Sequence, residues 1–144
     1  MVEIKQHYVD CLAQASYAIY SEKEVFIIDP RRDVDQYIDE AKEQGAKIIG
    51  VMLTHLHADF VAGHRELARR AKAPLYIGKN AGPKYDFTAL TDGMSVTFGK
   101  AKVEFLETPG HTPGDITAVL FDLDKSTTTP VAAFTGDTLF NGDV

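Results

Sequence analysis

The sequence predicts a mixed α/β fold in which strands and helices come first and strands alone follow. One continuous run of apolar and β-branched residues, KIIGVML, is typical of a strand buried on both faces. Two stretches before residue 72 have helical spacing, and from Asp92 onward short strand-like stretches recur with turn residues between them. This order of elements favours an α+β fold or a layered α/β/α arrangement.

The size and composition of the chain are those of one ordinary globular domain. Its 144 residues suffice for a single buried core, with 44% hydrophobic and 25% charged residues. The formal charge of −6 disfavours nucleic acid and an anionic membrane surface as partners. No apolar run approaches a membrane span or a signal peptide, and the single cysteine fits a reducing compartment. We therefore expect a cytoplasmic protein.

The first elements are predicted to be a hairpin and an amphipathic helix. The runs QASYAIY and EVFIID are separated by the charged turn SEKE, and Pro30 ends the second strand. The stretch DVDQYIDEAKEQG then has helical spacing, with Asp33 as candidate N-cap and Gly45 at its C-terminal end. The apolar positions of this helix are Val34, Tyr37, Ile38 and Ala41.

The remaining elements are a second helix and a series of strands. The buried strand KIIGVML runs directly into Thr54 and His55, and a helical stretch follows over roughly residues 60–71. APLYIG, MSVTFG, AKVEFLET, ITAVLFDL and VAAFTGD are predicted strands. The chain stops at FNGDV, directly after a strand and in mid-loop. We therefore expect the chain to be part of a larger domain.

The segment THLHADF carries the first cluster of candidate ligands. His55 and His57 follow the end of a buried strand, where side chains can converge on a crevice. Asp59 adds an oxygen ligand or a carboxylate that could orient a histidine. A single histidine here could be a capping or surface residue, but capping does not require an alternation of two histidines and an aspartate. His64 falls on an apolar helix face and is expected to be packed or solvated rather than a ligand.

Two further clusters follow other predicted strands. His111 sits in TPGHTPGD, a turn made rigid by two prolines and two glycines. Asp137 follows the apolar run VAAFTG. Three strand ends thus supply His55, His111 and Asp137. Two imidazoles and one carboxylate with open positions opposite them match the ligand set of non-haem Fe(II) oxygenases, and with more ligands the same set could hold zinc.

Taken in order, these motifs resemble the metallo-β-lactamase superfamily. Asp29 in IIDP, the THLHADF segment, His111 and Asp137 match the pattern of that superfamily. Within it, THLHADFVAGHRELARR and GDTLFNGDV most resemble bacterial persulfide dioxygenases, which are often fused to rhodanese domains. The resemblance implies an αββα sandwich, with residues 1–144 as the N-terminal portion of a catalytic domain whose C-terminal part is absent. Such a chain would expose a half-core, and we expect it to self-associate.

The resemblance also implies an activity and a set of site residues. One Fe(II) per chain would be held by His55, His111 and Asp137, with His57 and Asp59 assisting catalysis from beside the ligands. The implied substrates are O2 and a low-molecular-weight thiol persulfide, such as glutathione persulfide. The products would be sulfite and thiol, a reaction of sulfide detoxification.

Phe60 separates this interpretation from its main alternative. It occupies the position at which relatives with two metals, such as glyoxalase II, carry a histidine ligand of the second metal. A phenyl ring cannot coordinate a metal, so the sequence favours one metal. The alternatives are a zinc-dependent thioester hydrolase of the glyoxalase II type, and an inactive fragment that only binds metal.

Overall fold

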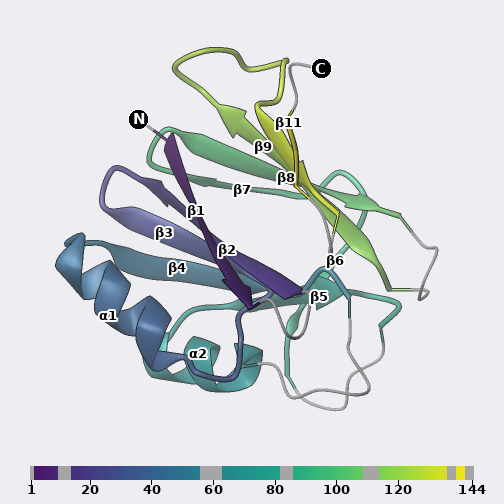
Figure 1. Cartoon of the computed structure of the whole chain (residues 1–144). Coiled ribbons are helices and arrows are strands. Elements are labelled where there is room, and N and C mark those ends of the chain that lie inside the picture. The colour runs from purple at the N-terminus through teal and green to yellow at the C-terminus, as the bar shows by residue number, and fades with distance from the viewer. Residues whose placement is uncertain are drawn as a thin grey trace.

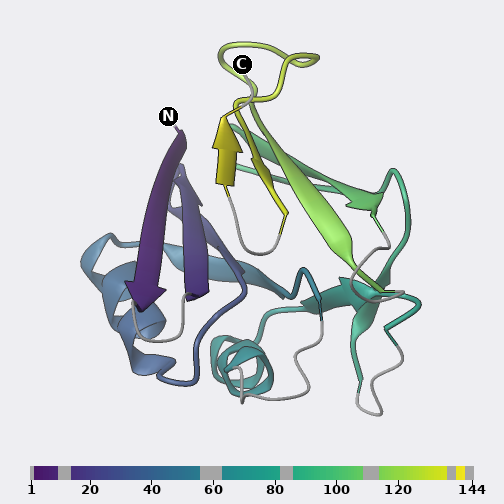
Figure 2. The same cartoon turned by 45° about the vertical axis from the view of Figure 1, so that its right-hand side comes forward.

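The protein forms three layers, in which two helices cover one face of a six-stranded sheet and a five-stranded sheet covers the other (Figure 1). Figure 2 shows both helices on the outer side of the first sheet, away from the second sheet. No helix among the described residues is long and apolar enough to cross a membrane. The computed structural model describes residues 2–9, 14–55, 63–81, 86–108, 114–135 and 139–141.

The six-stranded sheet combines an antiparallel half with a parallel half. Its strands are β1 (Val2–Val9), β2 (Gln14–Ser21), β3 (Glu24–Ile28), β4 (Lys47–Met52), β5 (Leu75–Gly78) and β6 (Thr88–Leu90), in that spatial order. Strands β1 to β3 are antiparallel, and β3 to β6 are parallel. The predicted hairpin is confirmed. Glu22 and Lys23 both have positive φ, which is the backbone shape that a two-residue hairpin turn requires.

The five-stranded sheet is antiparallel throughout its described strands. These are β7 (Ser95–Phe98), β8 (Ala101–Glu107), β9 (Ile116–Asp122), β10 (Ala132–Phe134) and β11 (Leu139–Asn141), in the spatial order β11-β10-β9-β8-β7. The described residues after Ala71 contain no helix. The predicted order of mixed elements followed by strands is therefore confirmed.

Helix α1 (Asp35–Glu43) confirms the predicted amphipathic helix but not its predicted cap. Tyr37 and Ala41 are buried against the first sheet, as the helical spacing required. The N-cap position is Val34, with no side-chain cap, so the prediction of Asp33 was wrong. Asp33 instead offers its backbone carbonyl to the side-chain amide of Gln36, at 2.9 Å.

Helix α2 (His64–Ala71) begins later than predicted. Gly63 is its N-cap residue and has a non-helical backbone, so the helix begins at His64. The Gly63 N–H donates to the carbonyl of Pro30 at 3.3 Å, and a Cβ at Gly63 would collide with the carbonyl oxygen of Arg31. Packing against the turn after β3 therefore sets the start of α2, and local helical spacing could not reveal it.

Two buried clusters hold the layers together. Between the sheets, Phe26 packs against Tyr76, Phe98 and Phe105 with ring centroids about 6 Å apart. Between the first sheet and the helices, side chains of β2 to β5 meet those of α1 and α2. Met94 is the only large hydrophobic side chain among the described residues that is exposed. The predicted layered α/β class is confirmed, whereas self-association stays a prediction.

Candidate metal site

The candidate site is built around the turn that follows β3. Asp29 has a φ of +54°, a left-handed conformation that aspartate tolerates better than most residues. Its N–H donates to the carbonyl of Met52 at 2.8 Å, which ties the turn to the end of β4. Its carboxylate accepts the N–H of Thr54 at 2.8 Å and the hydroxyl of Thr54 at 2.7 Å. The ends of β3 and β4 are thus joined by three hydrogen bonds.

The same hydroxyl orients the first predicted ligand. The Oγ1 of Thr54 lies 3.1 Å from the Nδ1 of His55. Since this hydroxyl donates its one proton to Asp29, it can only accept from His55, which places the imidazole proton on Nδ1. The Nε2 atom then carries the lone pair, and this is the form in which histidine binds a metal. His55 therefore fits the role that the sequence predicts for it.

The turn that carries His111 is anchored beside His55 at its two described ends. The N–H of Ile116 donates to the carbonyl of Thr54 at 2.7 Å, which connects the start of β9 to the end of β4. Thr108 closes the turn, because its N–H donates to the carbonyl of Asp115 at 3.0 Å. His111 itself lies outside the described residues. Its flanks nevertheless end next to His55.

The segment that carries Asp137 starts close by. Phe134, the last residue of β10, is paired with Ala118 of β9, two residues from Ile116. The ring of Phe134 also packs edge-on against Tyr17, with centroids 4.9 Å apart. Asp137 lies outside the described residues. The flanks of all three predicted ligands therefore converge on one end of the sandwich, while the ligand set itself stays a prediction.

The other residues of the predicted site have different positions. His57, Asp59 and Phe60 lie in residues 56–62, outside the described part of the chain. Within the part that is described, no three histidine, cysteine or acidic side chains come together as a metal site. His64 is partly buried at the start of α2, as expected for a packed histidine. Burial lowers the pKa of His64 from 6.5 to about 4, and the charge of Arg65 contributes to this shift.

Two contributions to the site were not anticipated from the sequence. Thr54 links Asp29 to His55, and its only sequence signal is its place between the strand and the first histidine. Gly63 returns the segment of residues 56–62 to the turn after β3, through its hydrogen bond to Pro30. In the sequence, a glycine before a helix is equally consistent with an ordinary N-cap residue that has no role in the site. Its close approach to the turn became evident only in three dimensions.

The layered α/β sandwich, at one end of which the flanks of the candidate ligands lie, has counterparts among known proteins. Its sequence matches the metallo-β-lactamase superfamily over residues 9–144, and the chain belongs to this superfamily. The sequence-based identification of the superfamily is thereby confirmed. The superfamily members that resemble the chain are named for two different activities, a hydrolase and a dioxygenase.

A hydroxyacylglutathione hydrolase of Acidiphilium cryptum is 35% identical over 119 residues, which cover 79% of this chain and 44% of the relative. The mitochondrial persulfide dioxygenase ETHE1 of Bos taurus is 35% identical over 121 residues, covering 81% of this chain and 44% of the relative. Among solved structures, a metallo-β-lactamase from Staphylococcus aureus superposes with a TM-score of 0.83 at 34% identity, covering 93% of this chain and 42% of that one. The chain thus spans about half the length of the relatives it matches.

Proposed function

We propose that this chain belongs to an iron-dependent dioxygenase that oxidises a low-molecular-weight thiol persulfide, such as glutathione persulfide. The observation that carries this proposal is Phe60. In a superfamily where this position can hold a ligand of a second metal, the phenyl ring offers no donor atom. A site with one metal, held by His55, His111 and Asp137, suits an oxygenase better than a binuclear hydrolase. The similarity to a persulfide dioxygenase agrees with this choice.

The overall reaction balances with water as a third reactant. One persulfide, one O2 and one water give one thiol and one sulfite with its two protons. The outer sulfur loses four electrons to O2, and its bond to the inner sulfur breaks. Iron, when held by His55, His111 and Asp137, would supply the redox chemistry with O2.

The residues of the chain contribute orientation and proton positions to this reaction. Thr54 and Asp29 favour the proton of His55 on Nδ1, which would leave the lone pair of Nε2 for the proposed metal. We assign Asp59 and His57 to supporting roles, in which they orient a ligand or a water molecule without binding the metal. The same hydrogen bonds fix His55 before any substrate arrives, so this part of the site needs no rearrangement.

A zinc-dependent thioester hydrolase is the second candidate. It is favoured by the hydroxyacylglutathione hydrolase of Acidiphilium cryptum, whose identity to this chain equals that of the persulfide dioxygenase. The flanking hydrogen bonds of Thr54 and Ile116 would serve a zinc site equally well. The two candidates differ in their metal, their need for O2 and their products.

The deciding experiment compares the chain prepared without oxygen in its iron-loaded and zinc-loaded forms. Each form is given glutathione persulfide with and without O2, and separately an acyl-glutathione thioester. We expect sulfite to appear with equal consumption of O2, and only in the iron form. Thioester hydrolysis by the zinc form, without sulfite production by the iron form, would replace the dioxygenase proposal with the hydrolase.

A further inference from the structure

We propose that Tyr37 is a positioning residue for the candidate metal site. Its hydroxyl holds the turn of residues 29–31 in place, and this turn fixes both ends of the segment of residues 56–62, which carries His57 and Asp59. Tyr37 lies on α1 and is assigned no contact with the proposed metal. It acts through backbone groups of the turn.

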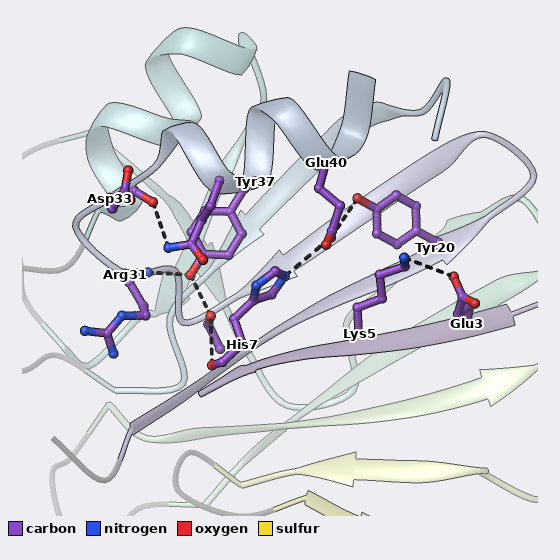
Figure 3. Close-up of polar contacts among 10 residues, drawn as sticks. Glu3, Lys5, His7, Tyr20, Arg31, Asp33, Tyr37 and Glu40 are labelled. Atoms are coloured by element: carbon purple, nitrogen blue, oxygen red, sulfur yellow. Dashed lines mark hydrogen bonds and ion pairs between the residues drawn. The ribbon is translucent and has the colours of Figure 1, made fainter. Parts of the chain in front are cut away.

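The first link joins Tyr37 to the turn (Figure 3). The hydroxyl of Tyr37 accepts the N–H of Arg31 at 2.8 Å and lies 2.6 Å from the hydroxyl of Ser16 on β2. Because it accepts from Arg31, its own proton is available for Ser16, whose hydroxyl in turn donates to the carbonyl of His7 at 3.5 Å. The Tyr37 side chain is completely buried, so water cannot replace this contact.

The second link joins the turn to both ends of the ligand segment. On the entry side, Asp29 accepts two hydrogen bonds from Thr54, directly before His55. On the exit side, the carbonyl of Pro30 accepts the N–H of Gly63 at 3.3 Å. The carbonyl of Arg31 lies so close to Gly63 that a Cβ there would collide with it. A shift of this turn by a fraction of an ångström would therefore displace the residues at both ends of the segment.

Asp29 is held by its own backbone bond to Met52, but the part of the turn after it depends on a side chain for its backbone donor. Asp29 has positive φ, and proline has no N–H with which residue 30 could bond to a neighbouring strand. The N–H of Arg31 is the next donor along the chain, and its acceptor is the hydroxyl of Tyr37. The edge of the His7 ring also packs against Tyr37, with centroids 5.1 Å apart, so the tyrosine has little room to move.

The test compares Tyr37→Phe with the matched control Tyr20→Phe. Tyr20 is also buried, and its hydroxyl donates to Glu40 of the same helix at 3.0 Å, but it has no described contact with the turn. Each variant loses one buried hydroxyl; Tyr37→Phe loses the bonds to Arg31 and Ser16, and Tyr20→Phe loses the bond to Glu40. Amide hydrogen exchange is measured by NMR without metal, at residues 31, 54 and 63 and at amides in the centre of β8.

In Tyr37→Phe, we expect exchange at Thr54 and Gly63 to rise roughly tenfold relative to the β8 amides, with no such rise in Tyr20→Phe. Equal exchange at these amides in the two variants would overturn the proposal. Should Tyr37→Phe fail to fold, Ser16→Ala carries the test, because it removes one of the two partners that hold the Tyr37 hydroxyl and leaves its buried proton unpaired. A rise at the same amides is again expected, and its absence would count against the proposal.

Metal affinity gives a second readout. Unlike amide exchange, it depends on the proposed metal site and so on the proposed function. Zinc binding is measured by competition with a chelator, for which no oxygenase activity is needed. Tyr37→Phe should weaken zinc binding on the order of tenfold, and Tyr20→Phe should leave it unchanged. Changed exchange with unchanged zinc affinity would show that the turn does not position ligands, and would overturn the positioning role. The identity of the reaction would be unaffected by any of these results.

Discussion

Replacing Thr54 by valine tests the hydrogen bonds that orient His55. Valine has nearly the same shape as threonine but lacks the hydroxyl, and Thr54 is only 2% exposed, so water cannot substitute for it. The variant loses the 2.7 Å bond to Asp29 and the 3.1 Å contact with Nδ1 of His55. The backbone bond from the N–H of residue 54 to Asp29 remains. The perturbation is therefore confined to one oxygen atom.

The size of the effect follows from the partners of that oxygen. A hydrogen bond to a charged group contributes about 1.5–3 kcal/mol, and the cost is greatest when the remaining partner stays buried. Asp29 is partly buried and keeps its bond to the backbone, so we expect the free energy of unfolding to fall by about 2 kcal/mol. Metal affinity should fall by about 10- to 100-fold, the usual effect of losing a group that orients a ligand.

The control for this experiment is Ser21→Ala. The hydroxyl of Ser21 accepts the N–H of Lys100 at 2.8 Å and is equally buried. It lies at the hairpin end of β2, about 16 Å from the site along the five residues of β3. Both variants are measured by urea unfolding and by zinc competition. If Thr54→Val and Ser21→Ala changed zinc affinity equally, the hydroxyl of Thr54 would not orient His55.

Three further predictions follow from the structure. In urea unfolding, Gly63→Ala should lower the free energy of unfolding by about 3 kcal/mol, because the added Cβ collides with the carbonyl of Arg31. Gly45 has open space around it, so Gly45→Ala should cost only about 1–2 kcal/mol, for the positive φ of that residue. Equal losses in the two variants would contradict this. Burial lowers the pKa of His64 to about 4, so the unfolded chain binds more protons below pH 6.5 and stability should fall from about pH 6.5 to pH 4. His64→Gln should remove about 1–2 kcal/mol of that dependence in urea titrations at each pH, less than the full pKa shift would give, because His64 is partly exposed and solvent screens it. Strand β1 lies at an edge of the first sheet, where its eight residues can pair with another copy. Sedimentation velocity should therefore reveal association that increases with concentration, and a monomer at all concentrations would refute it.

The local patterns of the sequence predicted those elements whose structure is decided locally. The helix over residues 35–43 follows from apolar spacing, and Gly45 has the positive φ expected at a helix end. The hairpin between β2 and β3 follows from two apolar runs and a short charged turn. The buried strand β4 follows from its continuous apolar sequence. In each case the signal and the structure lie in the same few residues.

Features decided by distant contacts were not predicted. Strand β1 was missed although Val2 to Lys5 alternate apolar and charged residues, a pattern typical of a half-buried strand; eight paired residues of β2 fix it in place. The N-cap of α1 and the start of α2 depend on the turn after β3. Of the candidate site, the sequence predicted His55 at a strand end, but not the link from Asp29 through Thr54 that orients it.

The candidate site is divided between the two sheets, and this division determines how mutations should act on it. His55 follows β4 of the first sheet, and the turn after β3 anchors both ends of residues 56–62, through Thr54 on one side and Gly63, the N-cap of α2, on the other. The second sheet supplies the flanks of His111 and Asp137, through the pairing of β9 with β10. At this end the two halves are joined by the hydrogen bond from Ile116 to Thr54. A change at Tyr37 should therefore disturb the ligands of the first sheet and leave the flanks from the second sheet in place, so that metal binding weakens without unfolding of the sandwich.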